Sequence, residues 1–401
     1  MTSRRRGLAT GVGGMAVGTA AGMAAIAGSR AAGRRIAART ERRLNPTTFV
    51  APYAASERAR AVHERLVVVD LHADSLLWGR DLLERGDRGH VDVPRLIDGN
   101  VALQVFAATT KSPRHLNIER NTDDSDDIVL LAVALGWPPA TWRSLLARAL
   151  HLAARADAMA RRSSGRLTIV RSRADLERHL RTRTPSWPVT AGLLSIEGAH
   201  ALDGDPANVD VVADAGFRMM SPSHFFDNAF GGSAHGVDKG GLTPAGHEMV
   251  RRMEARSMIV DVAHASAATI DDILAIATRP VVTSHTGVRG VADNARNLSD
   301  AHLRGIAATG GLIGIGFWPT ASGGDDAEAI ARSIKHATNV AGMEHVALGS
   351  DFDGAVQTPF DASGMVQVTD ALLEAGFTDD EVARVMGGNA IRVLTEALPP
   401  G

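Results

Sequence analysis

Residues 66–74, with the sequence LVVVDLHAD, form an apolar run that leads into two carboxylates and a histidine. Seven later segments repeat the pattern of a short apolar run followed by helical periodicity. The eight runs are Leu66–Asp70, Val101–Ala107, Ala191–Ile196, Phe217–Ser221, Met258–Val262, Val281–Ser284, Leu312–Phe317 and Val346–Ser350. Most are continuous rather than alternating, which is typical of strands buried on both faces of a parallel sheet. The repeats therefore predict an α/β fold, a (β/α)8 TIM-like barrel.

One interval, residues 108–188 between the second and third runs, is too long for a simple crossover. It contains the acidic sequence DDSDD (Asp123–Asp127), followed by a helical pattern near Ile128–Arg162. We expect a helical insertion here, over or beside the barrel mouth. The acidic sequence is expected to be a solvated surface or a helix start rather than a metal site. Helix starts are also visible elsewhere, as in the capping-box pair Thr378 and Glu381.

The N-terminal 50 residues differ in composition from the rest of the chain. Residues 1–45 hold nine Arg and one Glu, whereas residues 46–401 hold 34 basic and 44 acidic residues, so the net charge of −2 joins a basic leader to an acidic body. The acidic body argues against nucleic acid as a partner. We expect residues 1–50 to be a leader and residues 51–401 to form one barrel domain.

The leader has the features of a targeting segment. Three arginines precede the Gly- and Ala-rich stretch Gly7–Ser29, which is typical of a signal sequence or a weak membrane anchor, with residues 25–27 as a cleavage site. This interpretation places the protein at a membrane or exports it. Six further arginines follow the stretch and resist translocation, so a disordered extension on a cytoplasmic protein stays open as the alternative.

Ionisable residues stand at the ends of six of the eight predicted strands. In a closed barrel these ends form a ring, so side chains far apart in sequence converge. The chain has no cysteine, which excludes disulfides and thiolate ligands and leaves His and carboxylates to bind a metal such as zinc. The residues at these ends are His72, Asp74, Glu197, His224, His264, His285, Asp351 and Asp353.

These residues suggest two metal ions rather than one. Glu197 can give one oxygen to each ion, with His72 and Asp74 completing one site and His264 and His285 the other. A hydroxide held between two divalent ions is a nucleophile at neutral pH. Asp351 is then expected to carry the proton from this water to the leaving amine.

Several segments together resemble the renal-type membrane dipeptidases, which are binuclear zinc peptidases of the amidohydrolase superfamily. The likeness runs from about residue 60 to residue 396. The segments are VDLHAD (69–74), SIEGAH (195–200), GLTPAGHEMV (241–250), DVAHAS (261–266), SHTG (284–287), ARNLSD (295–300), GSDFDG (349–354) and GGNAIRVL (387–394). Their order and spacing, taken together, are highly specific.

The resemblance implies roles that spacing does not. It implies two Zn²⁺ on the five ligands named above, bridged by Glu197, and proton transfer by Asp351. It also implies that His224 contacts the substrate and stabilises the oxyanion, that Arg296 holds the free C-terminal carboxylate, and that a homodimer forms. Asp353 is expected to be structural. The chain departs from the animal enzymes in lacking their cysteines, and the sequence FFDNAFGGSAHG after His224 is expected to shape its own side-chain pocket.

The leading hypothesis is therefore zinc-dependent hydrolysis of dipeptides, with tolerance of a D-residue at the C-terminal position. An N-acyl amino acid deacylase or a lactonase would keep the same ligands and is the alternative. A catalytically inactive, membrane-tethered binding protein would require the loss of a ligand or of Asp351, and none is missing.

Overall fold

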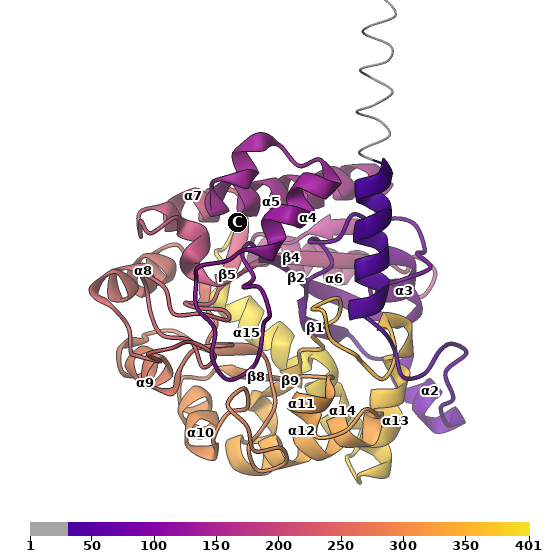
Figure 1. The fold of residues 1–401 in the computed structure, drawn as a ribbon. Helices are drawn as coiled ribbons and strands as arrows, with labels where there is room; N and C mark the ends of the chain where they lie inside the picture. Colours follow the sequence, from indigo (N-terminus) through magenta and orange to yellow (C-terminus); the bar gives the residue numbers. More distant parts are fainter. Residues whose placement is uncertain (1–30) are drawn as a thin grey trace, which may run out of the picture.

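The computed structural model describes residues 31–401; the stretch Gly7–Ser29 and its expected cleavage site lie outside these residues. A strand overlaps each of the eight predicted runs, which confirms the TIM-like barrel (Figure 1). All strand pairs are parallel, in the order β6-β5-β4-β2-β1-β9-β8-β7, and a parallel bridge between Asp261 and Val282 joins the two ends. The barrel strands are β1 (Val68–Ala73), β2 (Val101–Thr109), β4 (Thr190–Glu197), β5 (Phe217–Met220), β6 (Ile259–Val260), β7 (Val282–Thr286), β8 (Leu312–Ile315) and β9 (Val346–Leu348).

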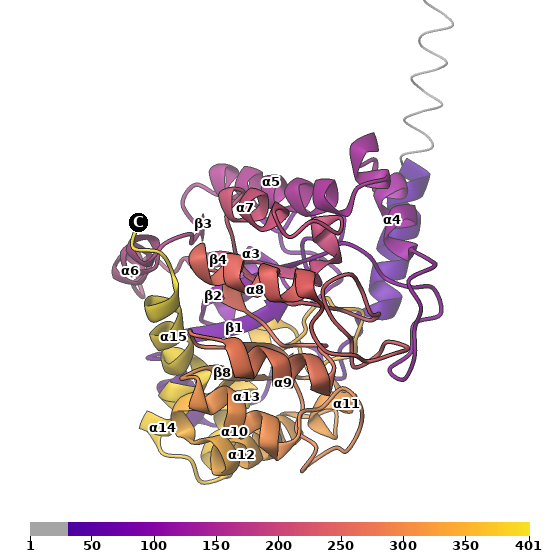
Figure 2. The same cartoon turned by 90° about the vertical axis from the view of Figure 1, so that its left-hand side faces the viewer.

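Helices surround the strands, as Figure 2 shows for α8, α9, α10 and α12. Most of them begin at a Ser, Thr or Asp side chain that accepts a backbone N–H, and Thr378 with Glu381 forms the expected capping box. The helices are α2 (Glu57–His63), α3 (Val93–Asp98), α4 (Asp127–Leu135), α5 (Leu145–Arg162), α6 (Arg173–Thr182), α7 (Asn208–Asp214), α8 (Pro244–Ala255), α9 (Ala267–Ile276), α10 (Asp300–Ala308), α11 (Pro319–Ser322), α12 (Ala327–Ala341), α13 (Val366–Glu374), α14 (Asp379–Ala383) and α15 (Asn389–Ala397).

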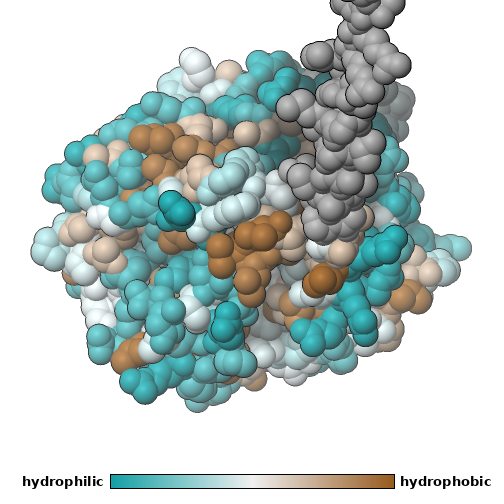
Figure 3. Space-filling model, turned by 45° about the horizontal axis from the view of Figure 1, so that its top comes forward, coloured by the Kyte–Doolittle hydropathy of each residue, from teal (hydrophilic) through white to brown (hydrophobic). Residues whose placement is uncertain are grey.

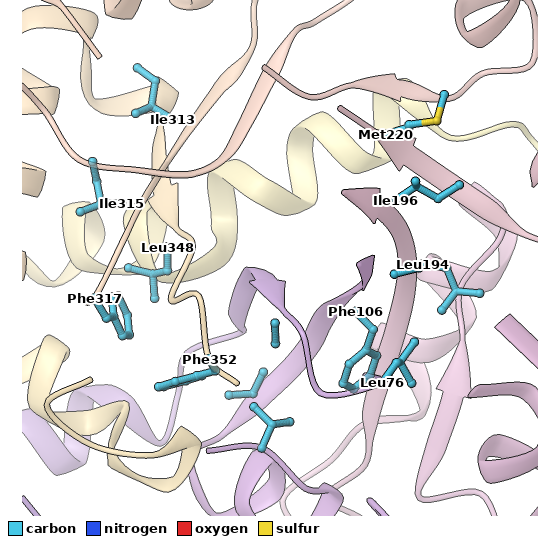
Figure 4. Packing of buried hydrophobic residues seen from close by; sticks show 14 of the residues in the cluster. Leu76, Phe106, Leu194, Ile196, Met220, Ile313, Ile315, Phe317, Leu348 and Phe352 are labelled. Atoms are coloured by element: carbon cyan, nitrogen blue, oxygen red, sulfur yellow. The ribbon is translucent and has the colours of Figure 1, made fainter. Parts of the chain in front are cut away.

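Successive strand residues belong to two separate apolar layers. Leu193 and Met219 belong to an inner cluster to which all eight barrel strands contribute, and Val393 and Leu394 of α15 pack into it. Their neighbours Leu194 and Met220 belong to an outer cluster that packs under the surrounding helices (Figure 4). A cluster built from every strand of a closed ring fills its interior, so α15 helps to fill the barrel.

The interval 108–188 contains the expected helices and one element that was not expected. Asp126, in the acidic sequence, caps α4, and Gly136 ends that helix in a left-handed conformation before α5 begins. A short strand, β3 (Leu167–Ile169), pairs in parallel with the first residues of β4. Three residues with little apolar pattern do not stand out from the helices on either side of them. Arg148 of α5 donates to the carbonyl oxygen of Thr110 at 2.6 Å, so the insertion supports the loop after β2.

Residues 31–44 are helical, and the segment that they begin contacts the barrel. Glu41 is 1% exposed and forms ion pairs with Arg80 and Arg88. Beyond the helix, Thr47 forms a parallel bridge with Thr358. The boundary expected at residue 50 stays a prediction, but the described part of this segment is in contact with the residues after β1 and β9.

The face of the molecule in Figure 3 is mostly hydrophilic, with apolar patches near its middle. Exposed apolar side chains of the described residues include Ile36, Leu130 and Val133. Within residues 31–401, none of the helices combines the length and the apolar character that crossing a membrane requires.

The inner cluster yields a stability prediction. Leu394 is 2% exposed, so Leu394→Ala should lower the free energy of unfolding by about 2–5 kcal/mol through lost burial and the cavity left behind. Chemical denaturation measures this change. Leu130→Ala is the matched control, because this helical leucine is 58% exposed and should change stability by about 0.5 kcal/mol or less. Equal losses in the two variants would contradict the assignment of α15 to the barrel interior.

Candidate active site

The eight residues expected to bind metal or substrate all lie at one end of the barrel. His72 and His285 lie near the ends of β1 and β7 and Glu197 ends β4, whereas the other five lie in loops that follow strands. All of them are buried, with 8% exposure or less: His72, Asp74, Glu197, His224, His264, His285, Arg296 and Asp351. The barrel therefore brings together side chains that come from six strand ends and one loop.

The Glu197 carboxylate lies at the centre of the group. Its Oε1 is 3.1 Å from Nε2 of His264, 3.4 Å from that of His285 and 3.6 Å from that of His72. Its Oε2 is 3.2 Å from Nε2 of His224. Oε1 thus faces histidines of both expected metal sites, whereas Oε2 faces His224, so a bridging role for Glu197 stays a prediction.

Three overlapping sets of ligand atoms are close enough together to hold a metal ion. The sets are His72–Glu197–His285, Glu197–His224–His264 and His72–Asp74–Asp351. Glu197 and His72 each belong to two sets. This grouping differs from the expected pairing of His264 with His285, although their Nε2 atoms are only 2.9 Å apart. Which histidines share an ion stays a prediction.

The donor atoms fit a metal such as zinc. His72 Nε2 is buried and has no hydrogen-bond partner among the described residues. Two imidazole nitrogens at 2.9 Å, as in His264 and His285, would each present a lone pair to the other unless a proton or a cation lies between them. Nitrogen and carboxylate oxygen are ligands that Zn²⁺ accepts.

The electrostatics also favour a cation. Burial and the neighbouring Asp74 raise the pKa of Glu197 well above its usual range. Burial raises the pKa of Asp351 to about 8, although His72 opposes the shift. For His72 burial acts to lower the pKa, but the carboxylates of Glu197 and Asp74 outweigh it and raise the pKa to about 10. Divalent cations would stabilise the charged carboxylates and reverse these shifts.

Hydroxyl and carboxyl groups behind the ligands hold them in place, and the sequence analysis did not assign them this role. Thr109, at the end of β2, lies within hydrogen-bond distance of both Asp74 and Glu197, with 3.0 Å between its Oγ1 and Oε2 of Glu197. Asp70 is fully buried and accepts both the N–H and the hydroxyl of Ser350, each at 2.7 Å. Asp70 was visible in the VDLHAD motif, but Thr109 carries no charge and gave no signal.

Two of the site residues have an unfavourable backbone conformation. His264 has φ 63° and Asp351 has φ 62°, in the left-handed region that non-glycine residues seldom adopt. Asp261 accepts the N–H groups of Ala263 and Ser284, both at 2.9 Å, and so joins the loop of His264 to β7. Such a conformation persists where surrounding contacts determine it.

Arg296 lies beside the histidines. Its Nη2 donates to the carbonyl oxygen of His285 at 2.6 Å, and its guanidinium carbon is 5.3 Å from the ring centre of Trp318. Burial lowers the pKa of Arg296 to about 10, against the attraction of Asp351, so it stays cationic at neutral pH. A buried guanidinium with free donors is suited to bind a carboxylate.

The loop after His224 adds a residue that sequence analysis did not single out. His235 is fully buried, and its Nδ1 lies 2.7 Å from the carbonyl oxygen of Ile118. Its Nε2 has no partner among the described residues, and its ring is 4.8 Å from that of Phe225 and 5.2 Å from that of His264. Phe225 and His235 of this loop thus lie beside His264, and the expected role of the segment FFDNAFGGSAHG in shaping a side-chain pocket stays a prediction.

A barrel of parallel strands with buried His and carboxylate side chains at its mouth defines a metal-dependent hydrolase. The sequence profile of the membrane dipeptidase family, peptidase family M19, matches residues 56–398, and the chain belongs to this family. It is a metallo-dipeptidase, and the family implies a metal cofactor, typically zinc, and a peptide substrate.

The chain is similar to two dipeptidases and to one uncharacterised protein. The chain is 29% identical over 317 residues to dipeptidase tcpJ of Claviceps purpurea, covering 77% of this chain and 69% of that protein. It is 32% identical over 247 residues to an uncharacterised Klebsiella pneumoniae protein from the pqqA 5′ region, covering 58% of this chain and 89% of that protein. The crystal structure of dipeptidase AC, an M19 metallopeptidase, is 25% identical with a TM-score of 0.68, covering 83% of this chain and 99% of that one.

Two further crystal structures share the fold. The metallopeptidase from Rhodobacter sphaeroides, liganded with a phosphinate mimic of the dipeptide L-Ala-D-Ala, has a TM-score of 0.68 at 24% identity, covering 83% of this chain and 99% of that one. The probable dipeptidase PvdM from Pseudomonas aeruginosa has a TM-score of 0.70 at 20% identity, covering 85% of this chain and 98% of that one.

The position of Glu197 leads to a metal-binding prediction. Adding Zn²⁺ to metal-stripped protein should raise its thermal midpoint, because an ion at 100 times its Kd stabilises the folded state by about 2.7 kcal/mol. Glu197→Gln should lose most of this gain and bind less metal, as measured by thermal unfolding and elemental analysis. Glu328→Gln on α12 is the control, because Glu328 is exposed and away from the site. Wild-type metal content in Glu197→Gln would contradict the central place of this carboxylate.

Proposed function

We propose that the protein hydrolyses dipeptides at a site for two zinc ions, and that it accepts a D-residue at the C-terminal position. The observation that carries the proposal is the buried Arg296 guanidinium, 3.4 Å from His264 and inside the group of candidate metal ligands. A carboxylate bound by Arg296 would set how far the substrate extends, so that a peptide bond close to its C-terminus lies over the ligands.

His72, Asp74, Glu197, His264 and His285 would hold the two ions, with Glu197 between them. When bound, such a pair of ions supplies a hydroxide nucleophile at neutral pH and polarises the carbonyl of the substrate. The protein's own groups then act on the substrate. His224 is 5% exposed, and burial lowers its pKa well below the usual range, so it stays neutral and is suited to donate a hydrogen bond to the developing oxyanion.

Asp351 is the group best placed to move the proton. Its Oδ1 is 3.9 Å from Nε2 of His72, beside the centre of the ligand group, and the backbone around it is held by Ser350. A carboxylate there can take a proton from the attacking water and pass it to the nitrogen of the leaving amino acid. The products are two amino acids, one of which leaves with its carboxylate on Arg296.

We expect tolerance of a D-residue because the protein would hold only the carboxylate and the scissile carbonyl of the substrate. Arg296 and the metal ligands would hold the carboxylate and the scissile carbonyl, and neither contact depends on the configuration at the Cα between them. The side chain of that residue would meet the loop of Phe225 and His235. The Rhodobacter sphaeroides metallopeptidase, which has this fold, is liganded with a mimic of L-Ala-D-Ala. L-Ala-D-Ala is therefore a suitable L,D dipeptide to test on this protein.

A substrate panel on zinc-loaded protein tests the proposal. Dipeptides of L,L and L,D configuration should both be cleaved, whereas N-acyl amino acids and lactones should turn over slowly. Faster turnover of acylated amino acids or lactones than of any dipeptide would overturn the proposal and favour a deacylase or a lactonase.

Arg296→Ala should raise KM about 30-fold or more and change kcat less, because it removes one partner of a buried charge pair with the substrate. Steady-state kinetics on a preferred dipeptide measure both constants. Arg304→Ala is the control, since Arg304 is an exposed arginine on α10, the helix that follows this loop. If a dipeptide amidated at its C-terminus is cleaved as well as the free acid, Arg296 does not bind the carboxylate.

Asp351→Asn should lower kcat about 10²- to 10⁴-fold, because the amide cannot accept the proton. Metal content should stay at the wild-type level, which elemental analysis of the same preparation checks. A variant that keeps wild-type kcat would remove Asp351 from proton transfer.

A further inference from the structure

The loop that carries Asp351 has an unusual backbone. Asp351, Asp353 and Ala355 have φ of 62°, 63° and 61°, so three non-glycine residues within five adopt the left-handed conformation. Each such residue costs free energy and persists only where its surroundings determine it. The same loop reaches a second candidate ligand, because the carbonyl oxygen of Phe352 accepts the N–H of Asp74 at 2.9 Å.

Asp353 is the residue through which most of this loop is held. Its side chain is fully buried and accepts from the Ser75 hydroxyl at 2.6 Å, from the His90 N–H at 2.6 Å and from the Arg80 guanidinium. Its carbonyl oxygen accepts from the indole of Trp78 at 2.7 Å. Contacts to the residues after β1 thus define the backbone on one side of Asp351.

The N-terminal helical segment completes this network. The Arg80 side chain is 3% exposed and binds Glu41 as well as Asp353, and Arg88 binds the other oxygen of Glu41 at 2.7 Å. Two guanidinium groups are thereby balanced by two carboxylates. At the end of the helix, Oδ1 of Asn45 accepts the N–H of Ala355 at 2.8 Å. The helical segment therefore reaches the left-handed loop twice, once through Arg80 and once directly.

Glu41 and Asn45 both precede residue 56, where the match to the family profile begins. We propose that Glu41 and Asn45 are positioning residues that hold the Asp351 loop in its catalytic conformation, so that the segment expected to be a leader contributes to the active site from residue 41 onward. The inference rests on the proposed function, in which Asp351 transfers the proton.

A positioning role affects one kinetic constant more than the other. Displacing the Asp351 carboxyl by a fraction of an ångström slows proton transfer, whereas substrate binding through Arg296 depends on a different loop. Loss of Glu41 should therefore lower kcat and leave KM nearly unchanged. It should also move the pH dependence of kcat, because the surroundings of the proton-carrying carboxyl change.

The test compares Glu41→Gln and Asn45→Ala with Arg42→Ala in the full chain. Arg42 lies on the same helix and pairs with Asp87, but both side chains are more than half exposed and neither bonds to Asp353, so this variant is the matched control. Glu41→Gln should lower kcat about tenfold or more with KM within about twofold of wild type. Asn45→Ala should lower kcat by a smaller factor, and Arg42→Ala should leave both constants unchanged.

Rates are expressed per metal-loaded folded molecule, so that loss of stability does not count as loss of activity. A Glu41→Gln enzyme with a lower thermal midpoint but wild-type kcat and pH profile would overturn the proposal, because its role would be structural only. If Glu41→Gln does not fold, Asn45→Ala decides: a lower kcat supports the proposal and a wild-type kcat overturns it.

Asp351→Asn, assayed alongside, separates this proposal from the one on which it rests. A wild-type kcat in Asp351→Asn would overturn both the proton-transfer role and the positioning role. An inactive Asp351→Asn beside a fully active Glu41→Gln and Asn45→Ala would overturn the positioning role alone.

Discussion

Three buried carboxylates, those of Asp74, Glu197 and Asp351, lie close together at one end of the barrel. Like charges at this distance in a medium of low dielectric cannot all stay ionised without a cation. Burial raises the pKa of Glu197 and of Asp351, and repulsion from the neighbouring carboxylate of Asp74 adds to both shifts. Much of the structure around the site serves this one constraint. Four histidines approach the carboxylates through their Nε2 atoms, and Thr109, Ser350 and Arg296 provide donors at the edges of the group.

The site depends on two layers of support that differ in kind. The strands place the ligands, because their carboxyl ends meet at one rim of the barrel. Buried carboxylates behind the site then fix the loops: Asp70 accepts the N–H of Ser350, Asp261 that of Ala263 and Asp353 that of His90. This second layer consists of carboxylates that bind backbone N–H groups, so it fixes loop conformation rather than side chains alone.

The sequence predicted the first layer and much less of the second. Eight apolar runs, most of them continuous, were sufficient to predict the strands, and the position of His72 or Glu197 at the end of a run was sufficient to predict convergence. The strand β3 was not predicted because its three residues are too few to show the apolar periodicity of a strand. The contacts of Arg80 with Glu41 and with Asp353 were not predicted either. They join residues that are 39 and 273 positions apart in the sequence, and no periodicity links such residues. Glu41 is the single glutamate among nine arginines in residues 1–45, so the composition of this segment did not predict a structural role for it.

The segment GGNAIRVL contains none of the candidate ligands, and the close approach of Gly387 to β1 explains what it does. A Cβ on Gly387 would lie 1.8 Å from the carbonyl oxygen of Val67, so only glycine lets the segment before α15 touch the start of the first strand. β9 pairs with β1, and α15 then fills the interior that the closed ring leaves. Residues 346–398 therefore complete a structure that residues 68–73 begin. During synthesis β1 can pair with β2 early, but it can pair with β9 only after nearly the whole domain has emerged from the ribosome.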